Sequence, residues 1–155
     1  MRLPEAHLIN GIWSDDAGVD ALDEPRSVPA ADDWRAVLEN VGWWGTYFGR
    51  TAFKTQAPIP LGHLPTVGRR AASFVDVVTT SGRGTGVAAS VDHMRVLREA
   101  VGDHPIGLAS GVTPENVHEM LPSVDAFRVA SGIEREFGKL DPGRTRELAE
   151  SIHAY

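Results

Sequence analysis

Three Ser-Gly pairs, each closing a short apolar run, are the first candidates for chemistry in this 155-residue sequence. They are Ser81-Gly82, Ser110-Gly111 and Ser131-Gly132. Glycine adopts positive φ and lets a ligand approach the backbone closely, and a helix that starts beyond such a turn offers unpaired N–H groups. Together these features make an anion site, most often for phosphate. Serine and glycine are also common in tight turns that bind nothing, and this alternative remains open.

Charged and polar groups at other expected strand ends could act on a ligand. Lys54 follows an aromatic run and could pair with a substrate anion or, once desolvated, transfer a proton. Asp15 and Asp16 follow an earlier run, and either could act as a general base or a metal ligand, so all three are candidate catalytic residues. A solvated position in a loop is the alternative for each. The glycine-rich segment supplies the candidate substrate contacts Thr80, Ser81, Gly82, Arg83 and Gly84.

Composition excludes several other classes of site. The chain has no cysteine, which removes disulfides, thiolate metal ligands and a cysteine nucleophile. Its net charge of −6 argues against binding to nucleic acid, which needs lysine and arginine for the phosphates. The six histidines show no metal-ligand spacing, and we expect neither a metal nor a cofactor. With no apolar run of membrane-spanning length and no signal-peptide core, a cytoplasmic protein without a membrane partner is expected.

Alternating strand and helix patterns predict how these residues are positioned. Strands are expected near residues 7–13, 43–48, 74–80, 105–109 and 126–130. Helical spacing of apolar residues fills the intervals, with Ser90, Thr113 and Asp141 as N-caps. Asn10-Gly11 could instead form a hairpin turn. Otherwise the alternation predicts a parallel sheet covered by helices, with ligands at the carboxyl ends of its strands.

The length limits which parallel α/β architecture is possible. We expect one α/β domain over residues 1–155, either a doubly wound open sheet or a part of a (β/α)8 TIM barrel. A complete barrel needs about 250 residues and eight strands. With about five βα units, the chain would therefore form an incomplete, barrel-derived fold.

Three segments resemble the last strands of the phosphate-binding TIM barrels. They are Gly84-Thr85-Gly86, the segment SGVTPENV at 110–117, and Ser131-Gly132-Ile133-Glu134. In order and spacing they are similar to the "GTG" loop, the "GG-x-x-P-E-N-V" turn and the final "SG-[IV]-E" of phosphoribosylanthranilate isomerase and the BtpA/SgcQ group. The resemblance covers residues 74–155, about half of the chain. It implies that Ser110, Gly111, Ser131 and Gly132 bind phosphate through backbone N–H groups, at strands corresponding to the seventh and eighth of a barrel.

Two departures favour the BtpA/SgcQ group over the isomerase. The isomerase family uses a cysteine base on its first strand and an aspartate acid at the end of a middle strand. This chain lacks cysteine, and Thr79-Thr80 stand at that strand end, with Asp76 expected toward the other end. The resemblance also implies that the first three strands of a barrel are absent.

The expected function is binding of a phosphorylated, sugar-phosphate-like small molecule. The resemblance is compatible with an isomerase-, lyase- or aldolase-like enzyme of the BtpA/SgcQ type. The alternative is a catalytically inactive, truncated barrel that serves as a ligand-binding or assembly module. Because open strand edges and an apolar inner face promote association, we also expect a homo-oligomer.

Overall fold

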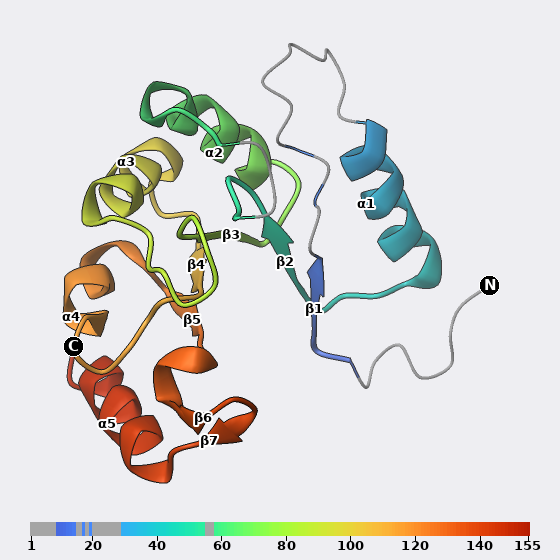
Figure 1. Ribbon diagram of the computed structural model, residues 1–155. Coiled ribbons are helices and arrows are strands. Elements are labelled where there is room, and N and C mark those ends of the chain that lie inside the picture. Colours follow the sequence, from blue (N-terminus) through green and yellow to red (C-terminus); the bar gives the residue numbers. More distant parts are fainter. Residues whose placement is uncertain (1–8, 15–16, 18, 20–28, 55–57) are drawn as a thin grey trace.

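A parallel sheet organises the computed structural model, which describes residues 9–14, 17, 19, 29–54 and 58–155 (Figure 1). Each strand pairs with the next one along the chain, and every pair is parallel. The five strands are β1 (Gly11–Ser14), β2 (Thr46–Arg50), β3 (Val77–Ser81), β4 (Ile106–Ala109) and β5 (Ala126–Arg128). The predicted order is therefore confirmed. The alternative hairpin at Asn10-Gly11 is wrong, because Gly11 pairs with Thr46 in a parallel register.

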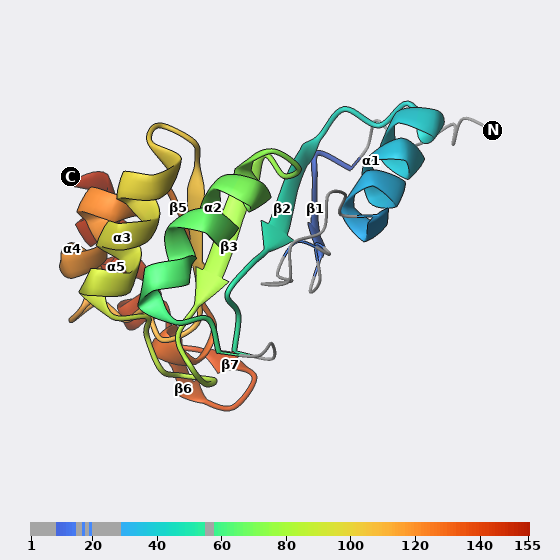
Figure 2. The same cartoon turned by 90° about the horizontal axis from the view of Figure 1, so that it is seen from above.

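Helices follow one another around the outside of this sheet (Figures 1 and 2). They are α1 (Pro29–Val41), α2 (Leu64–Ala72), α3 (Val91–Val101), α4 (Val117–Met120) and α5 (Pro142–His153), with the 3-10 helices η2 (Leu61–His63), η3 (Leu121–Ser123) and η4 (Ser131–Ile133). An antiparallel hairpin of β6 (Glu134–Glu136) and β7 (Lys139–Leu140) precedes α5 and was not predicted.

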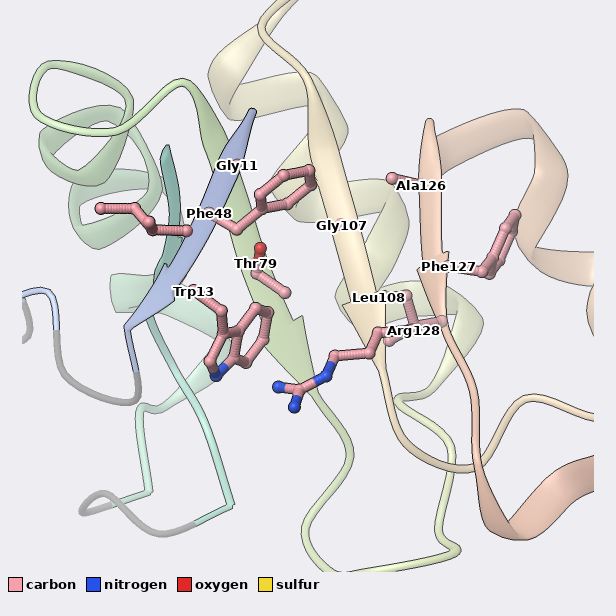
Figure 3. A pocket seen from close by; sticks show the side chains of 10 residues that line it. Gly11, Trp13, Phe48, Thr79, Gly107, Leu108, Ala126, Phe127 and Arg128 are labelled. Atoms are coloured by element: carbon pink, nitrogen blue, oxygen red, sulfur yellow. The ribbon is translucent and has the colours of Figure 1, made fainter. Parts of the chain in front are cut away.

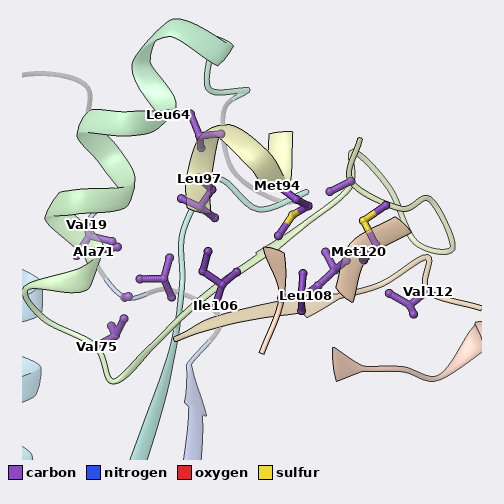
Figure 4. Packing of buried hydrophobic residues seen from close by; sticks show 14 of the residues in the cluster. Val19, Leu64, Ala71, Val75, Met94, Leu97, Ile106, Leu108, Val112 and Met120 are labelled. Atoms are coloured by element: carbon purple, nitrogen blue, oxygen red, sulfur yellow. The ribbon is translucent and has the colours of Figure 1, made fainter. Parts of the chain in front are cut away.

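The hydrophobic core lies between the sheet and these helices (Figure 4). Ile106 and Leu108 of β4 are fully buried, and they pack in one cluster with Met94 and Leu97 of α3 and Leu64 of α2. Side chains alternate across a strand, so the intervening Gly107 belongs to the opposite, inner face. A Cβ at Gly107 would lie 2.8 Å from the Thr79 hydroxyl oxygen on β3. The helices thus cover only the outer face of the sheet.

The sheet is strongly curled. In a flat sheet, four steps of about 4.8 Å would place β1 and β5 about 19 Å apart. The Arg128 guanidinium of β5 nevertheless lies 4.3 Å from the centre of the Trp13 ring on β1. The two edge strands therefore face each other across a concave inner face. Parallel βα units curled in this way form a half-barrel, which confirms the predicted incomplete TIM-barrel-like fold.

Local capping explains where two of the helices begin. The Ser90 hydroxyl accepts from the N–H of His93, and the Asp141 carboxylate accepts from the N–H of Arg144, as predicted for N-caps. Thr113 does not cap a helix, because α4 begins only at Val117.

The strand predicted at 43–48 is observed at residues 46–50. The Trp43 indole N–H donates to the backbone oxygen of Ile9, which holds Trp43 ahead of β2.

Candidate phosphate-binding edge and adjoining pocket

The loops that follow β4 and β5 contact each other backbone to backbone. A Cβ at Gly132 would lie 1.8 Å from the carbonyl oxygen of Val112. Because β4 and β5 are paired neighbours, both loops leave the same edge of the sheet. The Ser110-Gly111 and Ser131-Gly132 loops thus lie side by side, as the sequence predicted.

The β3–α3 loop, residues 82–90, packs against the same pair of loops. A Cβ at Gly111, whose φ is +75°, would lie 2.0 Å from the backbone nitrogen of Ala88. A Cβ at Gly82 would lie 2.1 Å from the carbonyl oxygen of Val87 in its own loop. Each glycine of the three Ser-Gly pairs therefore permits a contact that a side chain would block. This packing is a structural reason for the repeated motif that does not require a ligand.

Ser110 fixes the tip of the β3–α3 loop. Its hydroxyl accepts from the N–H of Gly86 at 3.1 Å and lies 3.2 Å from the carbonyl oxygen of Gly84, to which it donates. Its backbone N–H donates to the carbonyl oxygen of Arg128 at 3.3 Å, which extends the pairing of β4 with β5. Ser110 thus holds two neighbouring segments together, and its N–H already has a partner.

Three other residues of these loops have backbone N–H groups that could bind an anion or are covered by the neighbouring loop. Among the described residues, no acceptor is found for the backbone N–H groups of Gly111, Ser131 and Gly132. Ser131 is exposed and Gly132 is half-buried, whereas Gly111 is buried beneath the β3–α3 loop. The unpaired donors therefore come from both Ser-Gly pairs, with the pair after β5 nearer to solvent.

Arg144 of α5 ties the two loops together. Its guanidinium donates to both carboxylate oxygens of Glu115, at 2.8 and 3.0 Å, and its Nε donates to the carbonyl oxygen of Gly132. Hydrogen bonds from Arg144 and then from Thr113 lower the pKa of Glu115 to about 2. A planar, bidentate pair fixes orientation as well as distance. Helix α5 thereby sets the relative position of the loops after β4 and β5.

Asn116 closes the turn that carries Glu115. Its side-chain oxygen accepts from the N–H of Thr113, and its amide group donates to the carbonyl oxygen of Gly111, both at 2.9 Å. The Pro-Glu-Asn segment is therefore a loop-bracing motif. Its carboxylate binds Arg144 and its amide fixes Gly111.

A pocket of about 550 Å³ lies on the other side of the β3–α3 loop. The candidate residues Lys54, Ser81, Gly82 and Arg83 all line it. The backbone N–H of Lys54 donates to the Ser81 hydroxyl at 3.0 Å, and its ammonium group lies 3.1 Å from the Thr85 hydroxyl. Gly84 lies outside this lining and faces Ser110 instead. The candidate residues are therefore divided between the two sides of one loop.

Thr80 acts on the wall of this pocket rather than on its interior. It is fully buried, and its hydroxyl donates to the carbonyl oxygen of Ala52 at 3.1 Å. The same hydroxyl oxygen lies 3.3 Å from Nε2 of His93, which lines the pocket. Desolvation lowers the pKa of His93, which favours a neutral imidazole. Sequence reasoning missed His93; the available signal was its place three residues beyond the N-cap Ser90.

The remaining candidates add little to this geometry. Asp15 and Asp16 lie outside the described residues. Arg50, which the sequence did not single out, is buried at the carboxyl end of β2, with its guanidinium 4.8 Å from the centre of the Phe53 ring. Within the described part of the chain, no group of His, Asp and Glu side chains is arranged to hold a metal ion, and no helix is long and apolar enough to cross a membrane.

A second, smaller pocket occupies the concave face of the sheet (Figure 3). Its volume is about 320 Å³, and its lining includes Trp13, Phe48, Thr79 and Arg128. Trp13 and Arg128 approach each other at its lower end in Figure 3, while Phe127 points away from them. The inner face is therefore mainly apolar, with one cation at the rim.

Comparison with known proteins supports the fold. No family model matches the sequence, and no curated protein matches it. The structure is similar to (S)-3-O-geranylgeranylglyceryl phosphate synthase from Thermoplasma acidophilum, solved with its substrate sn-glycerol-1-phosphate. The TM-score is 0.63 at 16% identity, over 92% of this chain and 62% of the synthase. The chain thus spans less than two thirds of that protein.

Two phosphoribosylanthranilate isomerases are also similar in structure. The enzyme from Thermus thermophilus has a TM-score of 0.49 at 20% identity, over 85% of this chain and 69% of that one. The enzyme from Thermotoga maritima has a TM-score of 0.46 at 13% identity, over 94% and 71%.

Proposed function

We propose that this chain binds a phosphorylated small molecule at the Ser110-Gly111 and Ser131-Gly132 loops. The main support is that the backbone N–H groups of Gly111, Ser131 and Gly132 have no acceptor among the described residues. These residues belong to two loops that contact each other. Adjacent backbone N–H groups make concave anion sites without any cationic side chain. Arg144 supports the site by fixing one loop against the other.

Two likenesses support a phosphorylated ligand and guide the choice of probe. The synthase from Thermoplasma acidophilum shares the fold and was solved with sn-glycerol-1-phosphate, which makes glycerol phosphates the first ligands to test. The segments at 84–86, 110–117 and 131–134 resemble the BtpA/SgcQ group, which we propose as the nearer relatives.

Catalysis is a further part of the proposal. Lys54 would act as the proton carrier, with Ser81, Gly82 and Arg83 as substrate contacts around the 550 Å³ pocket. Thr80 and Gly84 would hold the walls of that pocket in place. Asp15 or Asp16 would supply a general base. An isomerase or lyase of this type gives turnover with a sugar phosphate, whereas a ligand-binding module gives binding alone.

Thermal melts test the phosphate site. One cooperative transition is expected, because we propose a single domain over residues 1–155. A glycerol phosphate or sugar phosphate at about a hundred times its dissociation constant should stabilise the protein by about 2.7 kcal/mol. Ser131→Asp should abolish the part of this shift that comes from the Ser-Gly loops, because a carboxylate at the exposed Ser131 repels phosphate.

Ser73→Asp is the matched control, since the exposed Ser73 lies between α2 and β3, at the opposite edge of the sheet. It should keep the full ligand-induced shift. The proposal is wrong if the wild-type protein shows no shift with any phosphorylated probe. It is also wrong if Ser131→Asp responds like the wild type.

The open inner face favours a second candidate, an assembly module that pairs with a second copy of the chain. Phe48 and Trp13 leave apolar surface on that face, which is a common cause of association. Light scattering should then show a homo-oligomer that Phe48→Asp dissociates. Trp44→Asp should leave it intact, because Trp44 is 72% exposed and lies outside the pocket lining. A wild-type monomer would exclude this candidate.

A further inference from the structure

The pocket beside Lys54 has an unusual charge for this chain. Lys54 and Arg83 line it, and no acidic residue does so among the described residues. The chain as a whole has a net charge of −6. Two cations that share a cavity without a carboxylate repel each other unless an anion enters.

Among the described residues, neither cation has a carboxylate partner. Arg83 is exposed and makes no hydrogen bond or ion pair within the described part of the chain. The Lys54 ammonium group contacts the Thr85 hydroxyl and lies 5.8 Å from the centre of the Phe53 ring, and neither contact supplies negative charge. Some cations elsewhere are paired with carboxylates, such as Arg98 with Asp125, Lys139 with Glu136, and Arg144 with Glu115.

The histidine of the pocket is held in one tautomer. The single hydroxyl proton of Thr80 is donated to the carbonyl oxygen of Ala52, so toward His93 the Thr80 oxygen can only accept. The proton of His93 is therefore assigned to Nε2, and Nδ1 keeps its lone pair. A neutral imidazole in this state accepts a hydrogen bond from a hydroxyl group.

Backbone strain marks the same wall of the pocket. Ala52 lines it with a φ of +49°, a conformation that costs a non-glycine residue free energy. The Thr80 hydroxyl bonds the Ala52 carbonyl oxygen and thereby holds this conformation. Strain maintained by a specific contact is typical of ligand-binding sites.

We propose that this pocket is a second anion site, distinct from the Ser-Gly loops, which binds the carboxylate or phosphate of a hydroxylated small molecule between Lys54 and Arg83. His93 accepts a hydrogen bond from a hydroxyl of the same ligand. The site rests on the same loop as the proposed phosphate site but uses side-chain cations instead of backbone donors. The chemical class is a hydroxy acid or a polyol phosphate.

Titration followed by NMR of the His93 imidazole tests this site directly. Two probes carry alcohol groups: glycerate, whose anionic group is a carboxylate, and glycerol 3-phosphate, whose anionic group is a phosphate. The third probe, inorganic phosphate, has no carbon-bound hydroxyl. The His93 ring resonances should shift with at least one hydroxylated probe. Inorganic phosphate should bind more weakly than that probe, because it has no alcohol to offer His93.

Variants separate the pocket from the phosphate site and from simple loss of charge. Lys54→Met and Arg83→Met should each weaken binding by about tenfold, since each removes one charge-assisted contact. Lys139→Met removes the same charge at the β6–β7 hairpin and should change nothing. Thr85→Val removes the hydroxyl contact of Lys54 but keeps its cation, and should also bind normally.

The outcomes distinguish this inference from the proposed function. Ser131→Asp should leave the His93 response intact while it abolishes the thermal shift attributed to the Ser-Gly loops. The second site is overturned if His93 resonances respond to none of the probes. It is equally overturned if both methionine variants bind as the wild type does.

Discussion

The two sides of the β3–α3 loop differ in how they use the same edge of the sheet. On the side of β4 and β5, backbones touch and the polar groups of the loop are bonded to Ser110. On the side of β2, the loop borders a pocket of about 550 Å³ lined by Lys54 and Arg83, which have no carboxylate partner among the described residues. The repeated Ser-Gly pairs therefore serve first to pack loops, while charged side chains gather where packing leaves space.

Both sides contain a residue with positive φ that is not glycine. These are Ser110 at +82° and Ala52 at +49°. Ser110 is held by its own hydroxyl, which bonds the tip of the loop, whereas Ala52 is held by the hydroxyl of Thr80. On the packed side, near β4 and β5, the strained residue is held by its own side chain. On the open side, near β2, the strained residue is held by a side chain from the neighbouring strand.

The largest effect is expected from filling the packed side. Gly111→Ala and Gly132→Ala should each destabilise the protein by about 3 kcal/mol or more, because each Cβ would lie within 2.0 Å of a backbone atom. Gly102→Ala should cost only about 1 kcal/mol, since it has positive φ but open space. Gly62→Ala has neither constraint and should be close to neutral. Chemical denaturation measures all four.

Equal losses of stability for Gly111→Ala and Gly102→Ala would contradict the close packing of these loops. They would mean that the loops move to accommodate a new side chain. Positive φ alone would then explain why residue 111 is glycine. The phosphate site would then need a looser geometry than the one described. A loss at Gly132→Ala alone would assign the rigid contact to the loop after β5.

Much of the fold could be predicted from the sequence because its signals are local. Apolar runs and helical spacing fixed the order of strands and helices, and a parallel sheet follows from alternation. Strand ends were less predictable because they depend on distant contacts. Trp43, for example, is held by Ile9, a residue 34 positions away. The β6–β7 hairpin was missed because Glu134–Leu140 lacks the alternation of apolar residues that marks a half-buried strand.

Ser110 offers a subtler contrast. Ser110→Ala and Ser110→Gly both remove the hydroxyl that bonds Gly84 and Gly86, but only glycine relieves the positive φ. Ser110→Gly should therefore be more stable than Ser110→Ala by about 1 kcal/mol, the reverse of the usual order. Parallel denaturant titrations measure the difference. If alanine is the more stable variant, the chain does not hold position 110 at positive φ.

The candidate site was predictable only in part, for reasons of distance and burial. The sequence indicated which loops share the carboxyl edge, because parallel strands place them there. The sequence did not show that Ser110 and Lys54 lie on opposite sides of the β3–α3 loop. Ser110 contacts Gly84 and Lys54 contacts Thr85, and both contacts depend on the path of that loop. His93 was missed because its partner Thr80 lies on another element, and no spacing rule joins them.

The smallest effect on stability is expected from acid, which protonates Glu115 and weakens its ion pair with Arg144. The pKa of Glu115 is about 2 in the folded protein, below its ordinary value of 4.5, so its ion pair with Arg144 stabilises the fold above about pH 4.5. This contribution should be lost as the pH falls from 4.5 toward 2. Unfolding temperatures of wild type and Glu115→Gln should therefore differ at neutral pH and converge in acid.

Arg144→Gln should give the same convergence, because Glu115 loses its main hydrogen-bond donor. The double variant should be no less stable than the worse single variant, since one interaction is removed twice. The effect is small because both side chains reach solvent, where ion pairs contribute little. Parallel pH profiles for wild type and Glu115→Gln would show that α5 does not brace the two loops through this pair. The packed side would then owe its geometry to the glycine contacts alone.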